Sequence, residues 1–244
     1  MIIKTQGIVL KSFDFRETSR IATFFTLDRG KVSGVLKGIR KDHRKFGSSV
    51  DRFSVNDIVY YQYRNSDLHL ISQCDLRQFF YPVRQDLKKS MAASYMSELV
   101  NALMPVEEEN SSVYELMMDF LKNLEEDADI DQLVHMLQIK MLLLSGFRPH
   151  LDACVICARQ MESDARFSLK EGGLVCEHCP SPDLEVHRIS RGTVASILHV
   201  ENNAWDNCRK LKFTEMVKKE LKYVLNNFLV FHLGRRLKSA KYLT

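Results

Sequence analysis

Residues 20–39 read RIATFFTLDRGKVSGVLKGI, and this stretch decides how the first third of the chain folds. On both sides of Asp28-Arg29-Gly30, β-branched and aromatic residues recur at every second position, which is typical of β-strands. Gly30 predicts a tight hairpin turn, because glycine adopts positive φ without a steric penalty. The stretch therefore predicts two strands, over about 20–27 and 31–39.

Three more strands are expected in the same region. The composition of 7–15, 58–61 and 68–74 matches that of the first two, and Asn65-Ser66-Asp67 provides a turn between the last pair. Five short strands favour a small closed barrel, and the OB-fold is the common five-stranded barrel that binds nucleic acid. We therefore expect residues 1–80 to form an OB-type nucleic-acid-binding domain.

After Tyr81-Pro82 the pattern becomes helical, with apolar residues three or four positions apart. Ser111 or Ser112 is the expected N-cap of the second helix. The expected helices are 85–104, 111–124, 131–145, about 190–200 and about 214–233. The predicted fold class is α+β: a five-stranded OB-type barrel (1–80), then a helical domain in two parts (81–149 and 183–244), with an inserted zinc-binding segment (150–182).

That insertion is predicted from two cysteine pairs. Cys154-Val-Ile-Cys157 and Cys176-Glu-His-Cys179 are separated by 18 residues, the spacing of a structural zinc site with four cysteine ligands. Such a site has no open coordination position, so its zinc ion stabilises a fold and activates no water. His178 is a spare ligand that four cysteines make unnecessary.

Other uses of four cysteines stay open at this stage. Two disulfides would suit a secreted chain, but the start Met1–Gln6 lacks the features of a signal peptide. An iron–sulfur cluster has more closely spaced cysteines, and a redox C-x-x-C motif normally occurs singly. Cys74 and Cys208 lie among apolar residues and are expected to be buried thiols. Free thiols beside a metal site fit the reducing cytoplasm.

Charge is unevenly distributed along the 244 residues, whose net charge is +4. Residues 1–80 carry 14 Lys and Arg against 8 Asp and Glu, and 205–244 carry 10 against 3. Between them, 98–131 carry 11 acidic residues and one basic residue. Opposite blocks favour separate surfaces for separate partners, although they are equally compatible with blocks that face each other. The basic C-terminal residues either extend a nucleic-acid surface, receive an acidic protein tail or form a solvated helix face.

The segment from Lys37 to Lys45 is the most concentrated basic feature, with six Lys, Arg or His side chains in nine residues. A basic loop at the rim of a barrel neutralises phosphates and releases counterions. Phe13, Phe15 and Phe46 either stack on bases or fill the barrel. The predicted DNA-binding residues are Lys11, Arg16, Lys31, Lys37, Arg40, Lys41, Arg44 and Lys45, and Arg20 could extend their surface.

Sequence motifs of common enzyme classes are missing. The chain contains no phosphate-binding P-loop, no G-x-G-x-x-G, no H-E-x-x-H and no G-x-S-x-G. Asp127–Asp131 begins like a calcium-binding loop, but Gln132 stands where the turn glycine is needed and Gln138 where the closing glutamate is needed. We therefore expect a binding protein, not an enzyme.

Several short motifs, in this order, resemble the bacterial recombination mediator family RecO. The resemblance covers essentially the whole chain, including the order of barrel, helices and inserted cysteine pairs. The motifs that carry it are Thr5-Gln6-Gly7-Ile8-Val9-Leu10-Lys11, Glu17-Thr18-Ser19-Arg20, Thr26 to Gly30-Lys31, Lys37-Gly38-Ile39-Arg40-Lys41 and His232-Leu233-Gly234-Arg235-Arg236-Leu237-Lys238-Ser239.

The resemblance implies a non-enzymatic DNA repair protein of the cytoplasm, associated with the nucleoid. Such proteins bind single- and double-stranded DNA, anneal complementary strands and, with RecR, help load the recombinase RecA onto strands coated by single-strand-binding protein. They also bind the acidic C-terminal tail of that protein, for which we expect a basic-rimmed apolar groove in the helical domain. The alternative to a recombination mediator is an RNA-binding or transcription-associated module that zinc stabilises.

Overall fold

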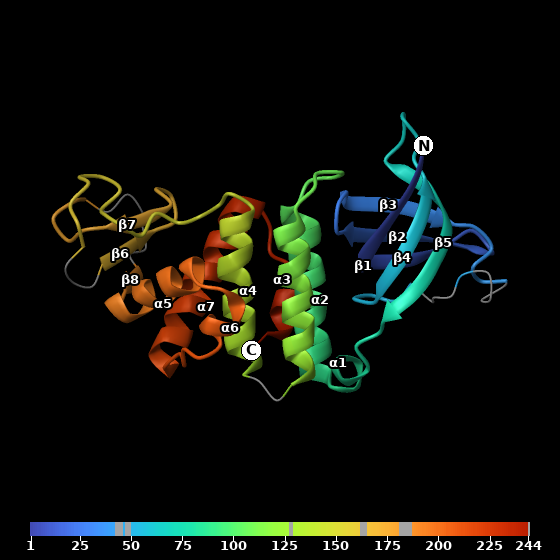
Figure 1. The fold of residues 1–244 in the computed structure, drawn as a ribbon. Coiled ribbons are helices and arrows are strands. Elements are labelled where there is room, and N and C mark those ends of the chain that lie inside the picture. The colour runs from blue at the N-terminus through green and yellow to red at the C-terminus, as the bar shows by residue number, and fades with distance from the viewer. Residues whose placement is uncertain (42–45, 47–49, 127–128, 162–164, 181–186, 244) are drawn as a thin grey trace. The chain divides into compact units, whose positions relative to one another are not determined.

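The structure is a computed structural model that describes residues 1–41, 46, 50–126, 129–161, 165–180 and 187–243 (Figure 1). The chain forms two compact units: unit 1 comprises Met1–Ala128 and Leu237–Thr244, and unit 2 comprises Asp129–Arg236. Among the described residues, no helix combines the length and apolar character needed to cross a bilayer. The finer division at 80, 149 and 182 stays a prediction.

Unit 1 begins with the predicted five-stranded barrel, which the structure confirms. The strands follow the order β1-β2-β3-β5-β4 and close on β1. All neighbours are antiparallel except β3 and β5, which are parallel. The strands are β1 (Ile2–Phe15), β2 (Ser19–Thr26), β3 (Gly30–Leu36), β4 (Val55–Tyr61) and β5 (Leu68–Gln78).

Strand β1 closes the barrel because it pairs with two partners. Its first half, from Ile2 to Ile8, pairs with β4, and its second half, from Gly7 to Phe15, pairs with β2. The register shifts between Val9 and Lys11, and such an irregularity bends a strand. The predicted strand began only at Gly7, because polar residues interrupt the apolar pattern before it.

The barrel interior is a continuous apolar core. It includes Phe24 from β2, Leu36 from β3 and Ile58 from β4, all at most 1% exposed. Burying a side chain of this size stabilises the fold by roughly 1.5–3 kcal/mol. Phe46 belongs to the same core, so it fills the barrel and cannot stack on a base, whereas Phe13 is 50% exposed.

Helices α1 (Tyr81–Gln85), α2 (Leu87–Leu103) and α3 (Ser111–Glu125) complete unit 1, together with the C-terminal 3₁₀ helix η1 (Ser239–Tyr242). The helix expected over 85–104 is confirmed as α2, which begins two residues later because Asp86 has an extended backbone and its carboxylate accepts the N–H of Lys89 at 3.0 Å. The short helix α1 was not predicted. The N-cap of α3 is Asn110, not Ser111 or Ser112, because its side-chain oxygen accepts the N–H of Val113.

Two polar contacts fasten α2 and α3 to the barrel. The Lys31 ammonium donates to the carbonyl oxygens of Asn101 at 2.9 Å and Met104 at 2.7 Å, at the end of α2. The Tyr114 hydroxyl of α3 donates to the Gln6 side chain at 2.9 Å. Burial lowers the pKa of Lys31 and raises that of Tyr114 to about 12. Tyr114 therefore stays protonated and keeps this hydrogen bond at neutral pH.

Unit 2 packs α4 against α5 and α7. A side-chain hydrogen bond of 2.9 Å between Gln138 and Asn226 joins α4 to α7. The three-stranded sheet β7-β6-β8 was not predicted, because strands of three or four residues are too short to show alternation. The elements are α4 (Ile130–Leu144), β6 (Ala165–Ser168), β7 (Gly173–Val175), β8 (His187–Ile189), α5 (Arg191–Asn202), α6 (Trp205–Cys208) and α7 (Glu215–Leu233).

Replacing Gly30 by alanine should destabilise the protein strongly. Gly30 has φ +59°, and a Cβ atom there would lie 1.9 Å from the Glu108 carbonyl oxygen. We expect Gly30→Ala to lower the free energy of unfolding by about 3 kcal/mol, measured by urea denaturation. Gly38→Ala is the control: its φ is +81°, but no atom lies within 4 Å of the new Cβ, so only about 1 kcal/mol is expected. Equal losses would contradict the steric argument.

Candidate nucleic-acid interface and metal centre

One end of the barrel brings two basic turns together. Phe15 pairs with Ser19 across the β1–β2 turn, and Arg20 pairs with Leu36 at the end of β3, so both turns lie at the same rim. The Arg40 backbone N–H donates to the Thr18 carbonyl at 3.1 Å, which joins the turn after β3 to the β1–β2 turn. Backbone geometry therefore places cations that are 20 residues apart in the sequence next to each other.

The rim cluster consists of Arg16, Lys37, Arg40 and Lys41, all of which are exposed. Asp14 forms an ion pair with Arg20 at 2.9 Å and a longer one with Arg40 at 3.6 Å. The hydrogen bond from Arg20 holds the pKa of Asp14 below its usual value. Among the described residues, Arg16, Lys37 and Lys41 have no acidic partner, so the rim keeps a net positive charge.

Aromatic side chains accompany these charges. The Arg16 guanidinium lies 5.1 Å from the centre of the Phe15 ring, and Phe13 on the same strand exposes half of its surface. Exposed aromatic rings among cations are the usual platform for unpaired bases. The rim thus combines the two elements of a single-strand-binding surface.

The other predicted DNA-binding residues are placed differently. Lys31 lies near the start of β3, and Lys37 follows the end of that strand, so the two residues are about 20 Å apart at 3.3 Å per residue. The Lys31 ammonium already donates to carbonyl oxygens at the end of α2. Lys11 is exposed on the second half of β1 and lines a separate pocket. Arg44 and Lys45 lie outside the described residues. The structure therefore brings together four of the eight predicted residues.

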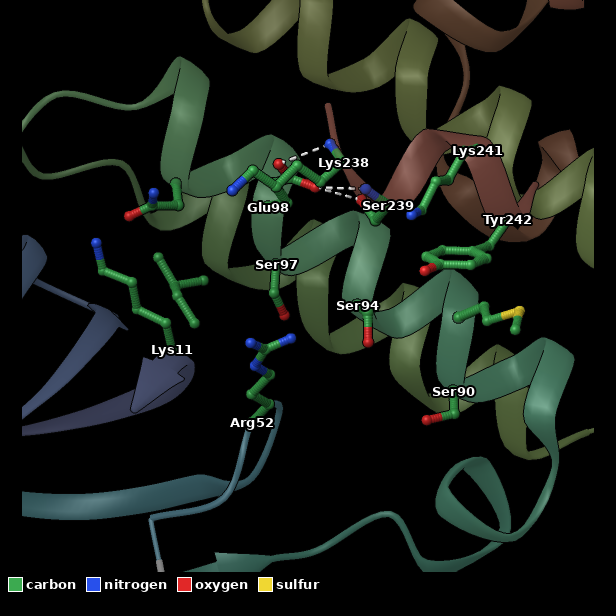
Figure 2. A pocket seen from close by; sticks show the side chains of 13 residues that line it. Lys11, Arg52, Ser90, Ser94, Ser97, Glu98, Lys238, Ser239, Lys241 and Tyr242 are labelled. Atoms are coloured by element: carbon green, nitrogen blue, oxygen red, sulfur yellow. Dashed lines mark hydrogen bonds between the residues drawn. The ribbon is translucent and has the colours of Figure 1, made fainter. Parts of the chain in front are cut away.

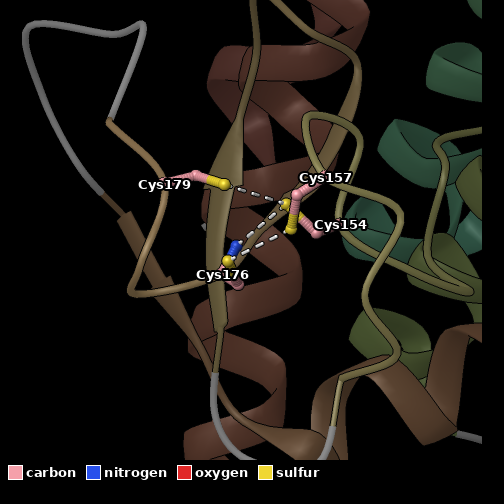
Figure 3. A group of neighbouring side chains, drawn as sticks. All are labelled: Cys154, Cys157, Cys176 and Cys179. Atoms are coloured by element: carbon pink, nitrogen blue, oxygen red, sulfur yellow. Dashed lines mark hydrogen bonds between the residues drawn. The ribbon is translucent and has the colours of Figure 1, made fainter.

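The four predicted metal ligands form one cluster (Figure 3). All four sulfur atoms lie within 4.8 Å of one another. The Sγ atoms of Cys154 and Cys179 are 3.9 Å apart, and those of Cys157 and Cys176 are 3.7 Å apart. Four sulfurs at about 2.3 Å from a tetrahedral ion would be separated by about 3.8 Å. The donor set fits a tetrahedral metal ion, and the separations are too long for disulfides.

The electrostatics of the cluster also fit a cation. Burial opposes ionisation of Cys154, but backbone N–H groups, first that of Cys176 at 3.4 Å, lower its pKa to about 6. In contrast, hydrogen bonding to Cys157, together with burial, raises the pKa of Cys179 to about 12. The backbone stabilises a thiolate here, but four negative sulfurs at this distance need a positive ion between them.

Two contacts join the cysteine cluster to the rest of unit 2. The Arg166 guanidinium on β6 donates to the carbonyl oxygens of Cys176 and Cys179, which fixes the second cysteine turn. Phe167, the next residue, packs edge-on against Phe228 of α7 with ring centres 5.7 Å apart. No sequence signal identified Arg166, because its role depends on a strand too short to predict. His178 is exposed and is not part of the cluster.

The C-terminal basic residues do not all remain available. Lys218 on α7 pairs with Asp129 at 2.6 Å and with Glu215 at 3.4 Å, and the hydrogen bond that it donates to Asp129 raises the pKa of Lys218. The charge pattern of the sequence therefore overstates the free positive charge of α7.

The two cysteines outside the cluster, Cys74 and Cys208, are fully buried, as expected.

Comparisons with known proteins cover the whole chain. A family model described as "Recombination protein O N terminal" matches residues 1–80, and one described as "Recombination protein O C terminal" matches 84–241. A curated relative named DNA repair protein RecO from Alkaliphilus metalliredigens is 30% identical over 236 residues, covering 96% of this chain and 95% of the relative. Relatives of the same name from Syntrophus aciditrophicus and Bacillus pumilus are 29% and 28% identical, covering 98% and 100% of this chain and 94% of each relative.

Removing two of the four cysteines should remove the metal. We expect the purified chain to carry one metal ion and Cys154→Ser/Cys157→Ser to carry none, as measured by inductively coupled plasma mass spectrometry. Because the ion binds only the folded arrangement of ligands, the variant should also lose a few kcal/mol of folding free energy. Its melting temperature should therefore fall by several degrees. Cys208→Ala, outside the cluster, is the control and should keep the metal. A wild-type chain without metal would contradict the assignment.

Proposed function

The chain belongs to the RecO family of recombinational DNA repair proteins, and from this premise we propose that it is a non-enzymatic, DNA-binding recombination mediator. In this proposal it anneals complementary strands and helps load the recombinase onto single-stranded DNA coated by single-strand-binding protein. It works in the cytoplasm, in association with the nucleoid. The observation that carries the proposal is the rim cluster of exposed cations on an OB-type barrel.

Annealing needs no catalytic group. It requires that the charges of two phosphate backbones be neutralised while the bases remain free to pair. The exposed rim cations Lys37 and Lys41, which have no acidic partner among the described residues, suit the first requirement. The exposed ring of Phe13 provides a sequence-independent contact for bases before they pair.

We assign the metal as structural zinc, held by Cys154, Cys157, Cys176 and Cys179. Zinc prefers four thiolates in a tetrahedron, and with all four positions filled it has no site for a substrate. When bound, it supplies positive charge that keeps the four thiolates together. The chain's own contribution is the positioning of those thiolates by backbone amides and by Arg166.

The proposed partners are single- and double-stranded DNA, RecR, the C-terminal tail of single-strand-binding protein and, indirectly, RecA. The mediator role requires them, because a recombinase must replace a bound protein on the strand. An acidic tail would be received by a basic-rimmed apolar groove in the helical region. The sites for RecR and for the tail stay predictions.

Reversing two charges of the rim should weaken DNA binding. We expect Lys37→Glu/Lys41→Glu to bind single-stranded DNA about tenfold or more weakly and to lower the slope of log affinity against log salt by about 1.4. Fluorescence anisotropy with labelled oligo(dT) at several salt concentrations measures both. Lys88→Glu/Lys170→Glu is the matched control, since it reverses two exposed lysines that do not belong to the rim cluster. Equal affinities of the two variants would exclude the rim.

The mediator function itself is tested by strand annealing. Complementary oligonucleotides coated with the cognate single-strand-binding protein should anneal faster with the chain present, and added salt should reduce the acceleration. Parallel reactions with RNA strands distinguish DNA mediation from general nucleic-acid binding. No acceleration by the folded, metal-loaded chain would contradict the proposal, as would a preference for RNA.

A further inference from the structure

A second basic site lies within unit 1, in a pocket of about 540 Å³. Figure 2 shows its three walls: Lys11 and Arg52 from the barrel, one side of α2, and the C-terminal segment that carries Lys238, Lys241 and Tyr242. A pocket of this size is in the range that binds small molecules or one unit of a polymer. No sequence motif marks it, because its residues come from four separate stretches of chain.

The pocket is positively charged. Lys11, Arg52, Lys238 and Lys241 line it and, among the described residues, form no ion pair. Among the described residues that line the pocket, Glu98 of α2 is the one that carries a carboxylate. Since four cations face one anion in a partly enclosed space, the pocket attracts a negatively charged ligand.

Glu98 itself is committed to structure. Its carboxylate accepts the backbone N–H groups of Lys238 at 2.9 Å and Ser239 at 2.8 Å, and the Ser239 hydroxyl at 2.6 Å. These bonds hold the C-terminal segment against α2 (Figure 2). The acidic residue therefore positions the wall that carries Lys238 and Lys241.

The remaining lining is polar with one aromatic ring. Ser90, Ser94 and Ser97 follow each other at helical spacing on α2, and these short side chains leave room for a ligand. The Ser97 hydroxyl donates to the Ala93 carbonyl at 3.0 Å, so Ser90 and Ser94 are the hydroxyl groups that a ligand could meet. Tyr242 is 50% exposed, and the Lys241 ammonium lies 4.7 Å from its ring centre. A cation next to an exposed ring is the arrangement that receives a phosphate and a base together.

We propose that this pocket binds a nucleotide unit of the same DNA strand that the rim cluster holds, with its phosphate among the four cations and its base on the Tyr242 ring. The inference rests on the proposed function, because it extends that DNA surface along β1. Lys11, in the pocket, and Arg16, in the rim cluster, are five residues apart on and just beyond β1, about 16 Å at 3.3 Å per residue. A single OB-fold covers about 4–16 nucleotides, so one strand can reach both places.

The test compares oligonucleotides of two lengths. With the full, metal-loaded chain, fluorescence anisotropy measures the affinity of labelled oligo(dT) of about 3 and about 30 nucleotides, below and above the roughly 4–16 nucleotides that one OB-fold covers. We expect Arg52→Glu/Lys241→Glu to weaken binding of the long strand about tenfold and to leave the short strand, which the rim alone can hold, nearly unchanged. The matched control with the same charge change is Lys88→Glu/Lys170→Glu, whose two exposed lysines lie outside the pocket.

A second pair of variants tests the aromatic contact without changing charge. Tyr242→Ala should weaken long-strand binding about tenfold, whereas Tyr242→Phe, which keeps the ring, should bind as the unaltered chain does. Because Tyr242 is half exposed, both variants should fold normally.

Each result decides the inference. If the pocket variants bind the long strand with wild-type affinity while Lys37→Glu/Lys41→Glu binds it weakly, the pocket is not part of the DNA-binding surface. The proposed function would then remain intact. Unchanged affinity in both the rim and the pocket variants would contradict the proposed function itself. Displacement of the long strand by micromolar free thymidine phosphates in the unaltered chain but not in Arg52→Glu/Lys241→Glu would show a site for a free nucleotide and overturn the strand assignment.

Discussion

The closure of the barrel by β1 is the constraint on which the rest of unit 1 depends. One strand must satisfy two partners, and it does so with an irregularity between Val9 and Lys11 that changes its direction. Closure leaves no free sheet edge and brings the β1–β2 turn beside the turn after β3. The same strand carries Lys11 into the pocket lining, so a single backbone feature positions both proposed DNA contacts.

Acidic and basic residues have different roles in unit 1. Glu98 holds the C-terminal segment through backbone N–H groups, and Asp14 pairs with Arg20 at the rim. Lys37 and Lys41 remain exposed and have no acidic partner among the described residues. Although the net charge of the chain is only +4, a strongly positive local surface results, because local arrangement and not total charge determines the field that a strand meets.

The cysteine cluster lies in a part of unit 2 that, in our proposal, a metal ion stabilises. Among the described residues, the apolar side chains packed against it include Val155, Met161 and Val175, and the strands beside it have three or four residues. When bound, the proposed metal ion would offset part of the entropy of ordering this segment. Arg166 connects the second cysteine turn to β6, and the contact of Phe167 with Phe228 connects β6 to α7.

Local patterns in the sequence determined the five barrel strands, the long helices and the four cysteine ligands, because strand periodicity, helical spacing and C-x-x-C pairs act over a few neighbouring residues. They could not divide α1 from α2 at Asp86 or identify the sheet around Arg166, since those features depend on single caps and very short strands. Only the tertiary structure decided that Lys31 serves the end of α2 while Lys37 stays exposed. It also joined Arg52 to Tyr242 in one pocket, because contacts between distant segments leave no periodic signal in the sequence.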